Sequence, residues 1–373
     1  MKLSFALLVG VSILAQINSA SDVATTRQAD TIFADLKSDH APGAAVLVLR
    51  NGHTVFERGY GVTDLRSLHA IDAHTNFRLA SVTKQFTAAA VMLLVHDGKL
   101  RYDDRLADVL PDFPAYGKAI TIRHLLNHTS GLLDYEDLMA KPDPSTPPEK
   151  IPQIHDAGVL ELLKQQTTTK FAPGTKWEYS NSGYVLLGLV VEKVSGESFG
   201  DFLRDRIFVP LHMGQTVAYE AGKNEVAHRA YGYTKNGNRW QETDQSPTSA
   251  TLGDGGVYSS LADLTRWDQT LRNHVLLSEA EMRPALTPVK VLTGTPEEPD
   301  GKPAAYGFGW FLNPYKGHAR MWHYGETVGF RTSIQRFVNE PLTVIVLCNR
   351  ADLEARDLAL KLADVYLDEN PGR

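Results

Sequence analysis

Apolar residues follow a strand-like pattern near the start of the chain. Ala44 to Arg50 is an apolar, partly β-branched run, and Thr54 to Tyr60 is predicted to be the returning strand. Between them stands Asn51-Gly52, a preferred two-residue hairpin turn. Before them, residues 22–39 carry apolar side chains at helical spacing. The pattern therefore predicts a helix followed by a β-hairpin.

A helix that is apolar on nearly every side is predicted next, beginning at Ser81. Its side chains from Val82 to Val95 leave almost no polar face, which is typical of a helix buried between other elements. Gly98 ends this helix. Shorter helices are predicted over residues 104–110, 121–128, 156–167, 182–194 and 199–207.

After about residue 250 the pattern changes to successive strands. Antiparallel strands are predicted over residues 306–313, 320–324, 332–338 and 342–348. Helices are predicted over 261–273, 278–286 and 353–367, and loops rich in Pro and Gly over 141–152 and 294–307. Strands at both ends with helices between them predict an α+β fold. One α/β lobe would hold an antiparallel sheet from residues 21–80 and 250–373, with a helical lobe of residues 81–249 inserted.

The first twenty residues differ from the rest of the chain. Lys2 precedes an apolar run from Leu3 to Ala15, and a polar stretch ends at Ala20. This order predicts a secretory signal peptide over residues 1–20, and therefore an exported protein. The apolar run is too short to span a bilayer and no second long run follows it, so no stable membrane insertion is expected.

Composition narrows the choice of partners. The chain has 373 residues and a formal net charge of −6. A nucleic-acid partner would need a basic face, so none is expected. Cys348 is the only cysteine, which excludes an intramolecular disulfide, and its apolar neighbours predict a packed core thiol. The sequence gives no indication of the oligomeric state.

The candidate chemistry begins with Ser81 and Lys84, three residues apart. On a helix such residues share a face, with Cβ atoms about 5–6 Å apart, so the hydroxyl and the amine can meet. The apolar helix would desolvate Lys84 and lower its pKa, which would make it a proton acceptor. A four-residue Ser-x-x-Lys match also arises by chance in many proteins, but here an unpaired Lys84 would be costly to bury.

Two further motifs follow in order along the chain. Tyr179-Ser180-Asn181 stands in a loop before a predicted helix, and His323-Tyr324-Gly325 ends a predicted strand. Together with Ser-x-x-Lys, they resemble the motifs of the serine β-lactamase and penicillin-binding family, nearest its class C and esterase-like branch. The likeness runs from about residue 25 to residue 368. It is strengthened by the stretches Phe77–Ala80, Thr121–Gly131 and Gly255–Ser260.

The resemblance implies a β-lactamase/transpeptidase-like fold and hydrolysis through an acyl-enzyme. Ser81 would attack a carbonyl carbon, while Lys84 and Tyr179 exchange the proton. The substrate would be a small ester, amide or peptide. The protein would act in the periplasm or in the medium of a bacterium. Neither a metal ion nor an organic cofactor is implied.

The resemblance also assigns residues to the substrate and to the developing oxyanion. Asn181, His323 and Gly325 would contact the substrate. The backbone N–H groups of Ser81 and Glu326 would form the oxyanion hole.

His323 departs from the family pattern, in which a lysine usually stands at this position. A lysine would bind the carboxylate of a β-lactam or of a peptide C-terminus, whereas histidine is mostly neutral at pH 7. A carboxylesterase-like preference for esters or uncharged amides is therefore favoured, although Arg331 could supply the missing cation. A D-alanyl-D-alanine carboxypeptidase, a D-aminopeptidase, a β-lactamase and a penicillin-binding sensor that acylates without turnover remain alternatives.

Two other patterns have structural explanations. Gly196-Glu197-Ser198-Phe199-Gly200 matches a nucleophile elbow, but it follows a predicted helix rather than a strand. Ser198 is therefore predicted to cap the next helix. His124 and His128 have the spacing of metal ligands, but no third ligand is evident, and both are predicted to brace a helix end.

Overall fold

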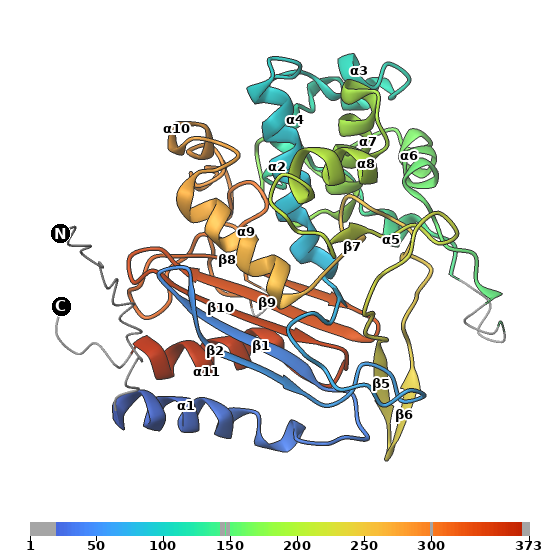
Figure 1. Ribbon diagram of the computed structural model, residues 1–373. Coiled ribbons are helices and arrows are strands. Elements are labelled where there is room, and N and C mark those ends of the chain that lie inside the picture. The colour runs from blue at the N-terminus through green and yellow to red at the C-terminus, as the bar shows by residue number, and fades with distance from the viewer. Residues whose placement is uncertain (1–19, 142–145, 147–149, 299–300, 368–373) are drawn as a thin grey trace, which may run out of the picture.

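One antiparallel sheet, whose strands come from both ends of the chain, lies between two layers of helices (Figure 1). The computed structural model describes residues 20–141, 146, 150–298 and 301–367, so the predicted signal peptide lies outside the described residues except for Ala20. The five strands lie in the order β2-β1-β10-β9-β8. Their bounds are β1 (Ala44–Arg50), β2 (His53–Tyr60), β8 (Arg320–Thr327), β9 (Phe330–Phe337) and β10 (Leu342–Cys348).

The sheet is covered on both faces because successive side chains of a strand point to opposite sides. One hydrophobic core holds every second residue of β1, namely Ala44, Val46 and Val48. The other core holds the residues between them, namely Ala45, Leu47 and Leu49. Helices α1 (Ala20–Ile32) and α11 (Ala355–Leu367) cover the first face, and helices from the middle of the chain lie over the second (Figure 1).

The β1–β2 hairpin confirms the turn predicted at Asn51-Gly52. Both residues have positive φ angles, 54° and 76°, as a tight hairpin turn of this type requires. Strand β10 pairs antiparallel with the whole of β1, from Ala44 opposite Cys348 to Arg50 opposite Leu342. Cys348 is fully buried, as predicted.

The helices above the sheet agree broadly with those predicted. Their bounds are α2 (Lys84–His96), α3 (Leu106–Val109), α4 (Ile122–Leu126), α5 (Tyr135–Leu138), α6 (Asp156–Lys164), α7 (Asn181–Ser195), α8 (Phe199–Leu203), α9 (Leu261–Asn273) and α10 (Glu279–Met282). Two small sheets had no clear sequence signal. Their strands are β3 (Phe77–Arg78), β7 (Val257–Ser259) and β4 (Val217–Ala218) in one, and β5 (Tyr233–Asn236) and β6 (Arg239–Glu242) in the other.

The α+β fold class is confirmed, but two local predictions are wrong. The α-helix begins at Lys84 rather than at Ser81, which lies in a 3-10 turn over Ala80–Thr83. Residues 306–313 do not form a strand. Gly309 has a φ of 75°, and a Cβ there would lie 2.8 Å from the Lys84 carbonyl oxygen, so the chain bends closely against α2. The division into two lobes at residues 81 and 249 stays a prediction.

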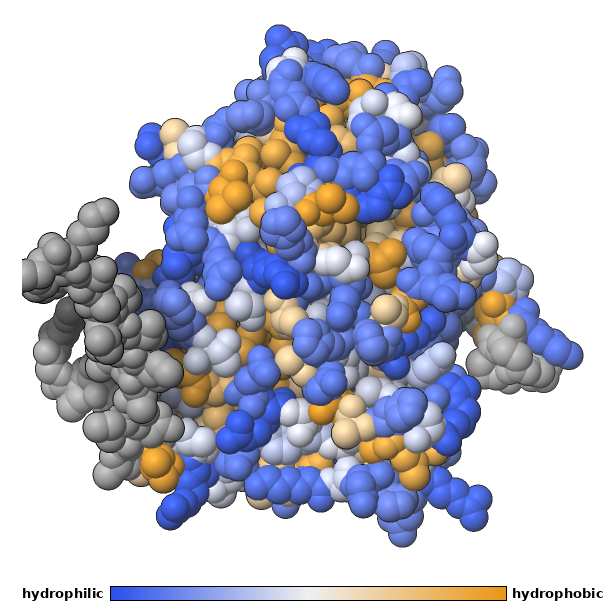
Figure 2. Space-filling view, in the orientation of Figure 1, coloured by the Kyte–Doolittle hydropathy of each residue, from blue (hydrophilic) through white to orange (hydrophobic). Residues whose placement is uncertain are grey.

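The face of the molecule seen in Figure 1 is mostly hydrophilic. Hydrophobic side chains show mainly in its upper half, around the helices, and hydrophilic residues surround them (Figure 2). No helix in the described part of the chain is both long and apolar enough to cross a membrane.

Asn349, the residue after β10, joins segments that are distant in the sequence. Its side chain is fully buried. Its Oδ1 accepts the Gly43 N–H at 2.7 Å, and its Nδ2 lies 3.0–3.3 Å from the carbonyl oxygens of Val62, Thr63 and Tyr231. One amide side chain therefore satisfies several buried backbone groups where β1, β10 and two loops meet.

We expect Asn349→Ala to lower the free energy of unfolding by about 3 kcal/mol, because it leaves buried backbone groups without partners. Urea unfolding followed by circular dichroism measures the change. Asn236→Ala, at an exposed position of β5, is the control and should stay within about 0.5 kcal/mol of the wild type. Equal losses in both variants would contradict the role given to Asn349.

Candidate active site

Ser81 lies on a strained turn between β3 and α2. The preceding residue, Ala80, has a φ of 48°, a left-handed conformation that residues other than glycine rarely adopt. The turn is fixed from behind, because the Leu79 N–H donates to the Val257 carbonyl of β7 at 2.9 Å. Strain of this kind persists only where the surroundings impose it, and it often accompanies a functional site.

Strand β8 meets the Ser81 turn at Gly325, and the contact leaves no room for a side chain. A Cβ at Gly325 would lie 2.1 Å from the Leu79 carbonyl oxygen and 3.1 Å from the Ser81 nitrogen. The Thr332 hydroxyl of β9 donates to the same Leu79 carbonyl at 2.8 Å. The backbone nitrogen of Ser81 thus lies beside β8, the strand that carries Glu326. Ser81 and Glu326 are the two residues whose backbone N–H groups are predicted to form the oxyanion hole. That role stays a prediction.

Lys84 is fully buried at the start of α2, and its ammonium group contacts three oxygen atoms. Its Nζ lies 3.1 Å from Ser81 Oγ, 2.9 Å from Asn181 Oδ1 and 2.9 Å from the Asp254 carbonyl oxygen. Burial lowers the pKa of Lys84 to about 8, against the opposing effect of nearby carboxylates. The neutral fraction of Lys84 near pH 7 is therefore larger than that of a solvent-exposed lysine.

The Tyr179-Ser180-Asn181 motif is held at the N-terminus of α7 by contacts from two other segments. Ser180 caps the helix, and its hydroxyl accepts the Gly183 N–H at 3.1 Å. The Ser180 N–H donates to Nδ1 of His128 at 3.1 Å, and the Asn181 N–H donates to the Asp134 carboxylate at 3.0 Å. These bonds bring Asn181 to Lys84 although the two residues lie 97 positions apart.

Tyr179 completes the group around the serine. Its ring centroid lies 4.9 Å from Lys84 Nζ. Burial raises the pKa of Tyr179 well above its usual range, while hydrogen bonding with Ser81 partly opposes the shift. Tyr179 is therefore a protonated phenol near pH 7 and can donate its proton, whereas Lys84 is the group suited to accept one.

His323 is fully buried and lies among aromatic rings. Its Nδ1 lies 2.6 Å from the Tyr324 carbonyl oxygen, which assigns the proton to Nδ1, and its Nε2 can then accept from the Tyr306 hydroxyl at 3.1 Å. The Tyr179 ring lies 6.2 Å from the imidazole, centroid to centroid. Burial and the Lys84 charge lower the pKa of His323 to about 3, so the ring is neutral. Its direct contact with substrate stays a prediction.

Three carboxylates lie around Lys84 and Asn181 and give this side of the site a negative charge. Asp134, Glu136 and Asp254 all act electrostatically on both Lys84 and Tyr179. Glu136 is exposed, and its Oε1 lies 3.5 Å from the Asn181 amide nitrogen. The Asp254 side chain is buried and accepts the Tyr135 hydroxyl at 3.1 Å.

Sequence reasoning missed these carboxylates and the place of His128. Asp134 and Glu136 belong to a short acidic run, Asp134-Tyr135-Glu136-Asp137, which was the available signal. His128 is buried with a φ of 61°, and its ring lies 4.4 Å from that of Tyr179. Its side chain supports the Tyr179 loop, while its backbone N–H donates to the Leu125 carbonyl at 3.4 Å at the end of α4.

The remaining sequence candidates have other environments. Ser198 caps α8, as predicted, and its hydroxyl accepts the Asp201 N–H at 3.2 Å. His124 shares a capping box with Thr121 at the start of α4. Arg331 donates to the Thr327 and Phe330 carbonyls at 2.7 and 2.8 Å within the β8–β9 hairpin. Among the described residues, no group of three His, Cys, Asp or Glu side chains could hold a metal ion.

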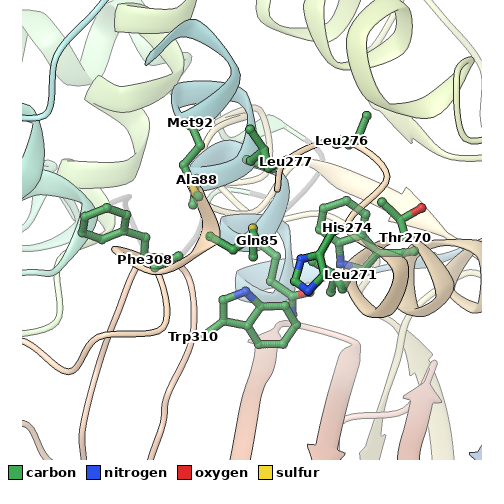
Figure 3. Close-up of a pocket in the computed structure, with 14 residues that line it drawn as sticks. Gln85, Ala88, Met92, Thr270, Leu271, His274, Leu276, Leu277, Phe308 and Trp310 are labelled. Atoms are coloured by element: carbon green, nitrogen blue, oxygen red, sulfur yellow. The ribbon is translucent and has the colours of Figure 1, made fainter. Parts of the chain in front are cut away.

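An apolar pocket lies along a neighbouring face of α2 and is distinct from the Ser81 site. Gln85, Ala88 and Met92 of α2 line it together with Trp310 and Leu277 (Figure 3). Its volume of about 20 Å³ leaves room for about one water molecule. It is therefore too small for a substrate.

Comparison with known proteins agrees with this geometry. A family model described as Beta-lactamase matches residues 29–367. The chain is 34% identical over 355 residues to penicillin-binding protein 4* of Bacillus subtilis, across 91% of this chain and 76% of that protein. It is 29% identical over 344 residues to the D-aminopeptidase of Brucella ovis, across 89% of this chain but only 61% of that protein.

A solved structure shares the fold. The D-amino acid amidase from Ochrobactrum anthropi SV3, in a complex with L-phenylalanine amide, superposes with a TM-score of 0.78 at 22% identity and covers 93% of this chain and 99% of its own. The family model covers most of the chain, the β-lactamase/transpeptidase fold agrees, and Ser81 and Lys84 are in contact. The chain therefore belongs to the Beta-lactamase family and is a serine hydrolase that acts through an acyl-enzyme.

Proposed function

We propose that this hydrolase cleaves amides and esters of amino acids that carry a free ammonium group, with a preference for the D configuration. The charge around Ser81 carries the proposal. The Asp134 carboxylate lies 3.0 Å from the Asn181 backbone nitrogen and Glu136 Oε1 lies 3.5 Å from the Asn181 amide nitrogen, on the side where the acyl part of a substrate would bind. An ammonium group close to exposed Glu136 would gain a charge-assisted hydrogen bond.

Substrates with a carboxylate at the leaving-group end would gain little from this site. His323 is neutral and buried, so it offers no charge to such a group. Arg331 is engaged with two carbonyl groups of its own hairpin. These surroundings support a preference for esters and amides whose leaving group carries no carboxylate, over β-lactams and peptides that end in D-alanine.

The D preference rests on the relatives. A D-aminopeptidase and a D-amino acid amidase are among the proteins that this chain resembles in sequence or fold. A relative in fold, EstCE1, is described as a hydrolase with promiscuous acyltransferase activity. The proposed acyl transfer is therefore compatible with this fold.

The geometry supports a two-step acyl transfer with Ser81 as nucleophile. Neutral Lys84 accepts the hydroxyl proton as Ser81 Oγ bonds to the carbonyl carbon, because its amine lies 3.1 Å from that oxygen. The backbone N–H groups of Ser81 and Glu326 stabilise the oxyanion. Protonated Tyr179 donates to the leaving nitrogen or oxygen and regains its proton from Lys84. Water then attacks the acyl-enzyme and releases the acid.

We also propose that the protein is exported, on the basis of Lys2 and the apolar run from Leu3 to Ala15. Fractionation of a bacterium that expresses the full chain tests this proposal. Export predicts a shortened mature form outside the cytoplasm, and a full-length product confined to the cytoplasm would refute it.

The function is tested with a panel of substrates on the purified protein. The panel contains D- and L-alanine p-nitroanilide, N-acetyl-D-alanine p-nitroanilide, a p-nitrophenyl ester and a chromogenic cephalosporin, with Ser81→Ala as the blank. We expect kcat/KM for D-alanine p-nitroanilide to exceed kcat/KM for N-acetyl-D-alanine p-nitroanilide by at least about tenfold. Fastest turnover of the cephalosporin would overturn the proposed substrate class, and a single burst without turnover would indicate a sensor.

The pH dependence of kcat/KM should follow Lys84. Its pKa is lowered to about 8 and only its neutral form accepts a proton, so the rate should rise with pH and level off above about 8. At pH 6 the rate should be about a hundredth of the plateau. Initial rates on the uncharged p-nitrophenyl ester give the profile without titration of a substrate amine. A flat profile between pH 6 and 9 would exclude Lys84 as the proton acceptor.

Replacing Glu136 by Gln should change selectivity and the pH profile together. Loss of the carboxylate should reduce the preference for free-amine over N-acetyl substrate by about tenfold. The Glu136 charge raises the pKa of Lys84, so the variant should also reach its plateau at lower pH. Asp137→Asn is the matched control, because the exposed Asp137 is the adjacent acid and is not among the charges that shift Lys84. An unchanged selectivity in Glu136→Gln would refute ammonium recognition by this residue while leaving the Ser81 mechanism intact.

A further inference from the structure

A second cleft, of about 550 Å³, lies between α4, the loop at Gly174 and residues 280–290. This volume is within the range of small-molecule sites. None of the catalytic candidates lines it. Asn127 and Thr129 contribute to its wall, while His128 between them supports the Ser180 loop. The cleft is therefore next to the Ser81 site but separate from it.

The charge of this cleft is opposite to that of the molecule as a whole. Arg123, Arg283 and Lys290 line it, and no Asp or Glu does so in the described part of the chain, although the formal net charge is −6. Arg123 is partly balanced by exposed Asp103 at 3.0 Å. Arg283 and Lys290 are both exposed and form no ion pair with a described residue. Two cationic side chains thus face a concave surface without a counter-charge.

Two polar side chains in the wall of the cleft, Asn127 and Thr129, accompany these cations. Asn127 and Thr129 are almost fully buried. The Thr129 hydroxyl donates to Asn127 Oδ1 at 2.7 Å, which uses the acceptor end of that amide and leaves its nitrogen as the donor. Guanidinium and ammonium groups are donors only. Phosphate and carboxylate oxygens are the groups that such a set of donors binds most strongly.

We propose that this cleft binds a small molecule that carries at least two phosphate or carboxylate groups. One group would lie between Arg283 and Lys290, and the other near Arg123 and the Asn127 amide. Two anionic groups are expected because the lining cations come from different elements, Arg123 from α4 and the other two from residues 280–290. The site is independent of the proposed substrate class, whose acyl part would be cationic.

Isothermal titration calorimetry on the purified protein at low ionic strength tests the proposal with two probes. Inorganic pyrophosphate represents phosphate ligands and citrate represents carboxylate ligands, so their relative affinities distinguish the two. We expect at least one probe to bind with one-to-one stoichiometry. Binding should weaken by at least about tenfold in Arg283→Glu/Lys290→Glu, which reverses both free charges.

The matched control is Lys193→Glu/Lys361→Glu, which causes the same change of net charge at exposed positions of α7 and α11. It should keep the wild-type affinity within about twofold. Both variants should retain their circular dichroism spectrum and their hydrolytic activity, which shows that they are folded. The proposal fails if neither probe binds the wild-type protein, or if the control loses as much affinity as the cleft variant.

Discussion

Burial of the Lys84 amine is the constraint on which the rest of the site depends. A charged amine is costly to place in an apolar interior, so it must find oxygen partners or lose its proton. Here both responses occur. Three oxygens surround Nζ, and they come from the Ser81 turn, from α7 and from the loop at Asp254. The same burial that would destabilise an unpaired lysine thus draws three distant segments together and gives the amine the pKa of a proton acceptor.

The carboxylates around Lys84 moderate this effect. Desolvation alone would lower the pKa of the amine further, whereas Asp254, Asp134 and Glu136 raise it again. Asp134 also fixes the Asn181 backbone, so one carboxylate acts on both the position and the charge of the site. Under the proposed function, selectivity for the charge of the substrate and the basicity of Lys84 would depend on the same carboxylates, so a change in one would alter the other.

Much of the fold could be predicted from the sequence, because period-two and helical patterns report directly on burial. The hairpin at Asn51-Gly52 and helix α9 are examples in which local pattern and tertiary packing agree. The prediction of a strand over 306–313 was wrong. The aromatic residues of this segment are buried because a bent loop packs against β8 and α2, and not because they belong to the sheet. The carboxylates and His128 could not be placed, since their roles depend on contacts between segments that share no local pattern.

The order of the strands has a consequence for how the protein is made. Strand β1 emerges early from the ribosome, but one of its two neighbours in the sheet is β10, near the end of the chain. The Gly43–Asn349 bond at the end of this strand pair spans 306 residues. Contacts of such long sequence separation close slowly, because a large loop must be ordered first. The sheet of the nascent chain therefore stays incomplete until nearly the whole chain has been synthesised. The same holds for the contact between β8 and the Ser81 turn.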